Sequence, residues 1–198
     1  MSLFRCVLSV LFVGCLGTCF SPSMASAQGE PFATFDRVKA RLAKGDVEAL
    51  TEVKALPGDT AISGLVRFFR ENHEVPQPTA KQKEIATRAA VLLTEAPTAE
   101  EYIKRLYKKV EDRPNSPQLV RQRTTVLQCL VIARNRFAVG QLVELLEESN
   151  LEVPVSQFVA ALGQMNLPGA PFGNTNANPA TVASWETWWK ANQGNVPK

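Results

Sequence analysis

Hydrophobic residues along most of the chain recur every three or four positions, between short segments rich in Gly, Pro, Asn and Asp. The segment 138–149 shows this pattern clearly, because its apolar positions fall on one helical face and its glutamates on the other. The apolar face consists of Val139, Leu142, Val143, Leu145 and Leu146, and the polar face of Glu144, Glu147 and Glu148. No segment alternates as a half-buried strand does. The pattern therefore predicts an all-α protein.

Residues that start and stop helices divide this pattern into consecutive elements. Thr79 with Gln82, and Thr98 with Glu101, have the spacing of capping boxes, in which the side chains satisfy exposed backbone amides. Asp46 and Asp59 are further expected caps. These signals predict helices at 47–55, 79–96, 98–110 and 138–149, and further helices that begin after Asp59, at Ser116, at Pro154 and at Asn178.

The helix that begins at Ser116, with Pro117 in its first turn, is expected to be largely buried. Its inner face would be formed by Leu119, Val120, Val126, Leu127, Leu130 and Val131. Arg121, Thr125 and Gln128 are spaced at i, i+4 and i+7, so we expect them to share an outward stripe.

Pairs of helices repeat along the chain. The Leu-Val-x-Phe-Phe sequence at 65–69 recurs as Leu-Tyr at 106–107 and as Leu-Val-x-Leu-Leu at 142–146, and a second helix follows each. Leu93, Leu130 and Leu162 fall at equivalent points of the second helices, 37 and 32 residues apart. A period of this size in paired helices is typical of an α-solenoid.

The second helices carry a family resemblance. The segments 88–93 (Arg-Ala-Ala-Val-Leu-Leu) and 158–163 (Phe-Val-Ala-Ala-Leu-Gly) resemble the second helix of HEAT repeats, over roughly residues 59 to 190. The middle pair departs from the motif, with Thr124-Thr125 in place of small alanines. The resemblance implies an α-α superhelix of about four helix pairs over residues 34–198, used mainly to bind proteins. It also implies a closing helix at 179–192, whose Trp185, Trp188 and Trp189 share one face.

The first 27 residues have the order of a secretory signal peptide. A single positive charge at Arg5 precedes an uncharged apolar run, and Ala25-Ser26-Ala27 forms a cleavage site. The run is shorter than the roughly 20 residues of a membrane-spanning helix. We therefore expect an exported protein, periplasmic or extracellular, with no integral span after cleavage and a flexible tether at 28–33. An uncleaved anchor, or a lipoprotein processed at Cys15, is the alternative.

Removal of this segment leaves one cysteine of four, Cys129, which lies in an apolar helical stretch. The mature chain then has no internal disulfide, and Cys129 is expected to be a buried small hydrophobic residue.

Charge is nearly balanced overall but uneven locally. The net charge of +3 falls to +2 without Arg5, which does not favour nucleic acid as a partner. Residues 101–136 nevertheless contain nine basic and three acidic groups. This stretch is either a solvated surface or a docking surface for an acidic protein, a polyanion or anionic lipids. In the second case Arg121 would line the concave groove, with Arg123 beside it if that residue is not drawn toward the core, and Lys104 and Lys108 would lie on the convex side.

The sequence contains no recognisable catalytic constellation. His73 is the only histidine, and no phosphate-binding glycine loop or nucleophile motif is present. We therefore expect no catalytic residues, no metal site and no cofactor. The three tryptophans either cap the last repeat or form an aromatic binding surface. The predicted function is a non-catalytic interaction scaffold for a protein partner; the alternative is an envelope enzyme, or an accessory subunit of one, whose carboxylates converge only in the folded chain.

Overall fold

The computed structural model describes residues 30–110, 115–148, 150–171 and 178–198, and within these ranges the protein is helical, without a β-strand. The elements are α1 (Glu30–Ala43), the 3-10 helix η2 (Val47–Ala49), α2 (Leu50–Lys54), α3 (Asp59–His73), α4 (Ala80–Thr94), α5 (Ala99–Tyr107), α6 (Pro117–Ala133), α7 (Arg136–Glu147), α8 (Val155–Gln164) and α9 (Pro179–Asn192). The predicted all-α class is confirmed. The predicted signal peptide lies outside the described residues. None of the described helices is both long and apolar enough to cross a membrane.

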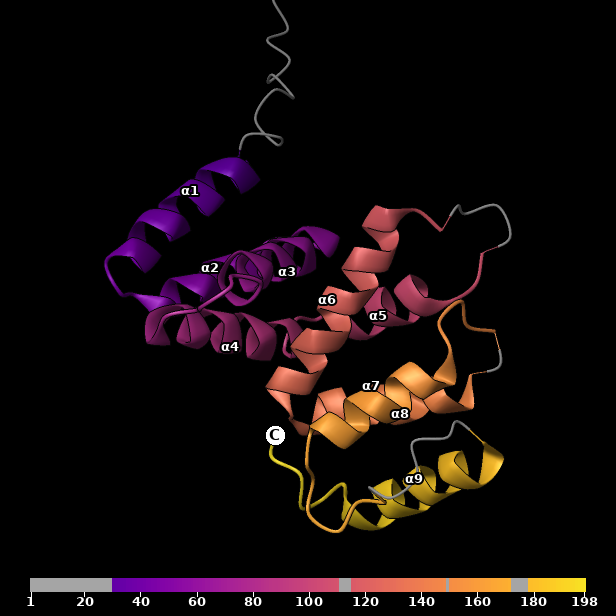
Figure 1. Cartoon of the computed structure of the whole chain (residues 1–198). Coiled ribbons are helices and arrows are strands. Elements are labelled where there is room, and N and C mark those ends of the chain that lie inside the picture. Colours follow the sequence, from indigo (N-terminus) through magenta and orange to yellow (C-terminus); the bar gives the residue numbers. More distant parts are fainter. Residues whose placement is uncertain (1–29, 111–114, 149, 172–177) are drawn as a thin grey trace, which may run out of the picture.

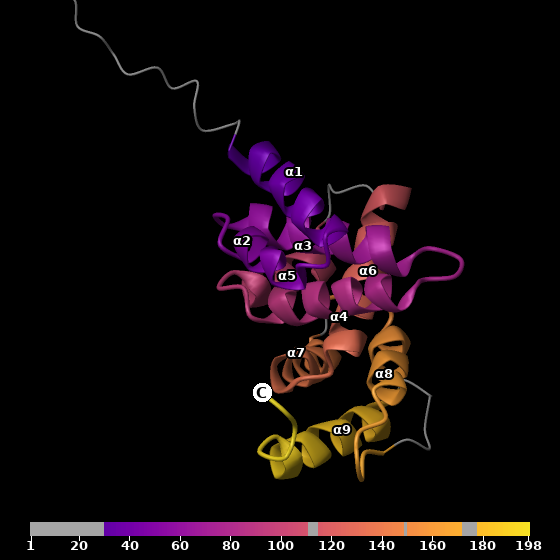
Figure 2. The ribbon, with the colours of Figure 1, turned by 90° about the vertical axis from the view of Figure 1, so that its left-hand side faces the viewer.

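The helices pack in two connected groups. Helix α3 lies along α4, α7 lies along α8, and α4, α6 and α8 contact one another in that order. Figures 1 and 2 show α1 to α5 in the upper part of the molecule and α7 to α9 in the lower part. Helix α6 runs steeply between the two parts in Figure 1. Helix α9 packs on α7 at the lower end. Its bounds are those predicted for the closing helix.

One apolar core extends from α1 to the C-terminal segment. Its largest fully buried side chains include Phe68, Phe69, Tyr107, Phe158 and Trp185. The Tyr107 hydroxyl satisfies its burial by donating a 2.7 Å hydrogen bond to the backbone oxygen of Arg123. Cys129 is fully buried in this core, as predicted.

Some predicted caps are confirmed. The capping box of Thr79 and Gln82 is present in full, with both reciprocal hydrogen bonds. Ser116 accepts a hydrogen bond from the Leu119 amide, and Asn178 accepts one from the Thr181 amide. In each case the cap and the amide are three residues apart, so the contact depends only on local backbone geometry.

Three other predicted caps are wrong. Thr98 makes no capping hydrogen bond, and its hydroxyl instead approaches the backbone oxygen of Gly58 at 3.3 Å. Asp46 and Asp59 do not cap because their carboxylates form ion pairs with Arg41 and Arg105, respectively. A charged partner from another turn or helix has displaced the local contact at these two positions.

Two element boundaries also differ from the prediction. Residues 30–33, expected in the tether, form the first turn of α1. Helix α5 ends at Tyr107 rather than at Val110, because the following backbone extends and pairs with the segment before α8. The Lys109 amide donates to the oxygen of Asn150 at 3.0 Å, and the Glu152 amide to that of Tyr107 at 3.2 Å. Most of the break expected at 112–116 lies outside the described residues.

The predicted inner face of α6 is confirmed at Val126 and Leu130, which are fully buried, and at Leu119, Leu127 and Val131, which pack partly buried against the core, but three positions of the helix differ from the prediction. Val120 is 46% exposed, whereas Arg123 and Thr125 are buried. The Thr125 hydroxyl tolerates burial because it has two hydrogen-bond acceptors within reach, the Arg121 backbone oxygen at 2.9 Å and the Glu74 carboxylate at 3.1 Å. The expected outward stripe of Arg121, Thr125 and Gln128 is therefore wrong at Thr125.

Candidate functional site between α3 and α6

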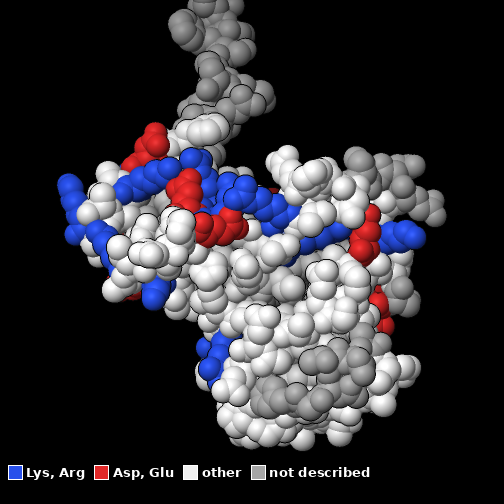
Figure 3. Space-filling model, viewed as in Figure 1, with Lys and Arg blue, Asp and Glu red and all other residues white. Residues whose placement is uncertain are grey.

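Helices α3 and α6 enclose a surface cleft of about 600 Å³. Its lining residues are Ser63, Val66, Arg67 and Arg70 of α3, and Pro117, Gln118, Arg121, Gln122 and Thr125 of α6. Three of these nine residues are arginines and none is acidic. In the view of Figure 3, charged side chains of both signs gather over the upper part of the molecule, while the described surface below them is largely uncharged. We call this cleft, defined by these nine residues, the arginine cleft.

Hydrogen bonds fix the uncharged part of the arginine cleft. Gln122 donates from its amide to the hydroxyl of Tyr102, a buried residue of α5. Ser63 also hydrogen-bonds this hydroxyl. Burial raises the pKa of Tyr102 above its ordinary value, which is the direction expected for a phenol held in an apolar environment. Three helices are thus joined at one end of the cleft.

Arg121 lies at the rim, where Glu74 holds it. Its side chain is exposed, and its Nη2 is 2.6 Å from Glu74 Oε2. Partial burial pushes the pKa of Glu74 upward, but the hydrogen bonds from Arg121 and Thr125 outweigh this effect and the pKa lies below its usual value. Glu74 is therefore ionised at neutral pH and orients the guanidinium, which keeps further N–H donors for a second acceptor.

The two arginines of α3 differ in their partners. Arg67 pairs with Glu71 at 2.8 Å, one turn along the same helix. Arg70 forms no ion pair with a carboxylate of a described residue, although its charge also lowers the pKa of Glu74. Arg70 is therefore the cation of the cleft with the most capacity to bind an incoming anion. A guanidinium can grip a carboxylate or phosphate with two parallel hydrogen bonds.

The sequence prediction did not include Arg67 and Arg70. They stand three residues apart on α3, which is the only signal that the sequence offers for a shared face. Their convergence with Arg121, about 50 positions further along the chain, depends on how α3 packs on α6.

Arg123 does not lie beside Arg121 in a groove; it is drawn toward the core, which is the exception that the sequence prediction allowed. Arg123 is buried, and its Nε donates to the Leu106 backbone oxygen at 2.9 Å. Its Nη2 forms an ion pair with Glu152, and its Nη1 lies 3.4 Å from Asn115 Oδ1. The side chain joins the end of α5, the start of α6 and the segment before α8, so its role is structural.

The predicted stripe of Lys104 and Lys108 on one helix is also wrong, because α5 ends before Lys108. Lys104 lies between two carboxylates, at 2.7 Å from Glu100 and 3.1 Å from Glu144. Hydrogen bonds to both carboxylates raise its pKa. Lys104 thereby links α5 to α7.

The tryptophans of α9 face the interior. Trp185 is 1% exposed and Trp188 is 9% exposed, and their rings meet edge to face with centroids 5.7 Å apart. Trp189 is half-buried against Gly140 of α7, where a Cβ would lie 3.1 Å from its Cζ2 atom. The three rings thus cover the end of the core and do not form an exposed aromatic surface.

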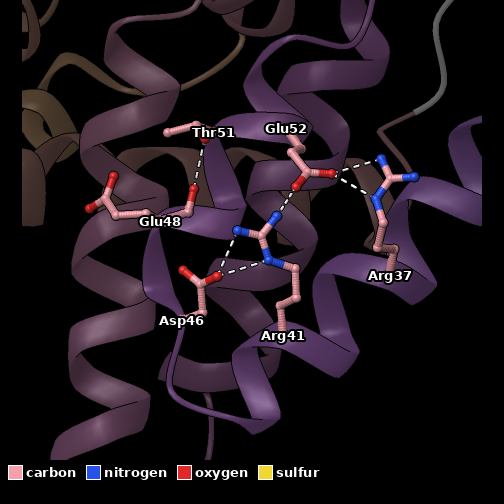
Figure 4. Close-up of polar contacts among 6 residues, drawn as sticks. All are labelled: Arg37, Arg41, Asp46, Glu48, Thr51 and Glu52. Atoms are coloured by element: carbon pink, nitrogen blue, oxygen red, sulfur yellow. Dashed lines mark hydrogen bonds and ion pairs between the residues drawn. The ribbon is translucent and has the colours of Figure 1, made fainter.

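A second concentration of charge, between α1 and α2, is compensated internally. Figure 4 shows Arg41 between Asp46 and Glu52, and Arg37 beside the same Glu52. The hydrogen bonding of the Arg41 guanidinium to the Asp46 carboxylate is the largest influence on the pKa of Arg41 and raises it. These groups satisfy one another, so the network holds α1 on the following turn and offers no unpaired cation to a ligand.

The described ranges contain no group of three or more His, Cys, Asp and Glu side chains placed to hold a metal ion. His73, at the end of α3, stacks on Phe69 with ring centroids 4.7 Å apart.

Comparisons with protein-family models, with curated proteins and with solved structures find no match to this chain. The fold therefore assigns the protein only to a broad structural class, that of all-helical proteins built by packing helix on helix.

Proposed function

We propose that this protein is an exported, non-catalytic scaffold that binds an acidic segment of a partner protein in the arginine cleft. The observation that carries the proposal is the composition of that cleft: three arginines, no lining carboxylate, and one guanidinium, that of Arg70, without an ion-pair partner among the described residues. A carboxylate-rich segment would provide the complementary charges.

The proposed architecture is a HEAT-like superhelix. Two observations support it. The helices follow one another as four consecutive pairs, α1 with α2, α3 with α4, α5 with α6 and α7 with α8, before the single α9. The second helices α4, α6 and α8 also contact one another in order, as stacked repeats require. Helix α5, with nine residues, is the shortest of the four first helices, and it belongs to the pair whose sequence departs from the HEAT motif.

Export is proposed from the signal-peptide pattern of residues 1–27. The partner would accordingly be a protein of the envelope or of the extracellular medium.

The test compares two double variants that remove equal charge. Tagged wild-type protein captures partners from the envelope fraction, and mass spectrometry identifies them. Arg70→Gln with Arg121→Gln should weaken binding of the principal partner roughly tenfold, because two exposed ion pairs contribute about 0.7 kcal/mol each. Lys83→Gln with Lys190→Gln lowers the net charge by the same amount, away from the cleft, and should leave binding unchanged.

Salt provides a second arm of the test. Binding should weaken as ionic strength rises above about 0.1 M, where exposed charges are screened beyond roughly 10 Å. Capture that resists both salt and the cleft substitutions would show that the arginines form only a solvated surface.

A further inference from the structure

Carboxylates of the chain itself already engage two of the three cations that line the arginine cleft. Arg67 pairs with Glu71 at 2.8 Å. Arg121 pairs with Glu74 at 2.6 Å. Arg70 forms no ion pair with a carboxylate of a described residue. An acidic segment that enters the cleft therefore meets one cation that is open to it and two that are already in contact with an anion.

Backbone and side-chain contacts hold Glu74 at the rim of the cleft. The residue directly follows α3, and its backbone amide donates to the Arg70 backbone oxygen at 3.1 Å. One carboxylate oxygen accepts a hydrogen bond from Arg121, and the other lies 3.1 Å from the Thr125 hydroxyl. Arg121 and Thr125 both line the cleft. Glu74 thus occupies donors that an incoming carboxylate would use.

The ion pair of Glu74 with Arg121 is accessible to exchange. The side chain of Arg121 is 63% exposed and that of Glu74 is 27% exposed. Exposed ion pairs contribute little to stability, so a carboxylate of a partner can replace that of Glu74 without unfolding of either helix. Since the pKa of Glu74 lies below its usual value, this carboxylate competes as an anion at neutral pH.

We propose that Glu74 is an internal competitor for the ligand of the arginine cleft, which occupies Arg121 until an acidic segment replaces it. Binding then exchanges one ion pair for another at Arg121, while Arg70 gains a partner. Glu74 thereby lowers the affinity of the cleft for carboxylates. This inference rests on the function proposed for the cleft and concerns the regulation of that same site.

Fluorescence anisotropy of a labelled hexaglutamate peptide with the purified protein tests this proposal. Glu74→Gln keeps the size of the side chain and an oxygen that accepts hydrogen bonds, but removes the charge. It should bind the peptide about threefold more tightly than the wild type, as expected when one exposed ion pair no longer competes. Glu148→Gln removes the same charge from an exposed residue at the end of α7 and is the matched control, which should bind as the wild type does.

An Arg121→Gln background shows whether the gain acts through Arg121. Most of the gain from Glu74→Gln should be lost there, because no guanidinium is left for the substitution to release. Binding by Glu74→Gln that is equal to or weaker than that of the wild type would overturn the proposal. A gain of the same size in the Arg121→Gln background would overturn it as well.

The double variant Arg70→Gln with Arg121→Gln separates this proposal from the one on which it rests. If the wild type does not bind the peptide, or if the double variant binds it equally well, the proposed function of the cleft is wrong and this inference with it. If the double variant binds more weakly but Glu74→Gln does not bind more tightly, only the competition by Glu74 is wrong. Circular dichroism of each variant confirms that the fold is intact.

Discussion

Arg123 illustrates how a single charged residue can belong to the core. Its side chain is 5% exposed, and that of its partner Glu152 is 16% exposed. The pair is stabilised only because the guanidinium also reaches the Leu106 backbone oxygen and Asn115. A buried ion pair contributes little relative to an apolar pair of the same shape, but breaking it leaves an uncompensated charge.

We therefore expect Arg123→Ala to lower the free energy of unfolding by about 3 kcal/mol. Arg121→Ala, only two positions away, should lower it by less than about 1 kcal/mol because that pair is exposed. Urea denaturation followed by circular dichroism measures both. Similar losses for the two variants would contradict the structural role of Arg123.

At the scale of the helices, close packing depends on small residues. Helix α3 approaches α1 and α2 at Gly64, where a Cβ would lie 2.6 Å from Phe35 Cε1 and 2.7 Å from Val53 Cγ1. Gly163, in α8, has no neighbour within 4 Å of the equivalent position. Two glycines inside helices thus have opposite expected responses to the same substitution.

Gly64→Ala should destabilise the protein by about 1–3 kcal/mol, because the added methyl group forces Phe35 and Val53 apart. Gly163→Ala should stabilise it by about 0.5–1 kcal/mol, because alanine loses less backbone entropy in a helix. Thermal unfolding of the two variants beside the wild type gives the signs. A stabilising Gly64→Ala would show that α1 does not lie against α3.

At the scale of the whole molecule, the described residues share one continuous apolar core, so the protein is expected to unfold as one unit. Helix α6 crosses between the upper and lower groups of helices (Figure 1) and carries Cys129, which is fully buried. Burial raises the pKa of this thiol well above its usual value, which further suppresses the reactive thiolate. Cys129 therefore reports on separation of the two groups.

In a protein with Cys6, Cys15 and Cys19 replaced by serine, a thiol reagent should modify Cys129 only through unfolding. The opening free energy derived from the modification rate should equal the free energy of unfolding in urea. Ser184→Cys in a Cys129→Ser background places a thiol on the exposed face of α9 and should react as fast as a free thiol. An opening free energy several kcal/mol below the global value would show that the upper and lower groups separate independently.

Features fixed by neighbours in the sequence were predictable. Helical periodicity indicated the all-α class, and the predicted bounds of α9 agree with the structure. The caps at Thr79 and Ser116 were predictable because each cap bonds an amide three residues away. Burial of Cys129 followed from the apolar residues on both sides of it.

Features that require partners distant in the chain were decided by tertiary structure. The Asp59 carboxylate pairs with Arg105, 46 residues away, and does not cap its own helix. Arg123 is buried where it pairs with Glu152, 29 residues away. The arginine cleft joins Arg70 of α3 to Arg121 of α6, about 50 positions further along the chain. Periodicity assigns a side chain to a face of its own helix. Only the packing of that helix against others determines whether the face is core, cleft or solvent.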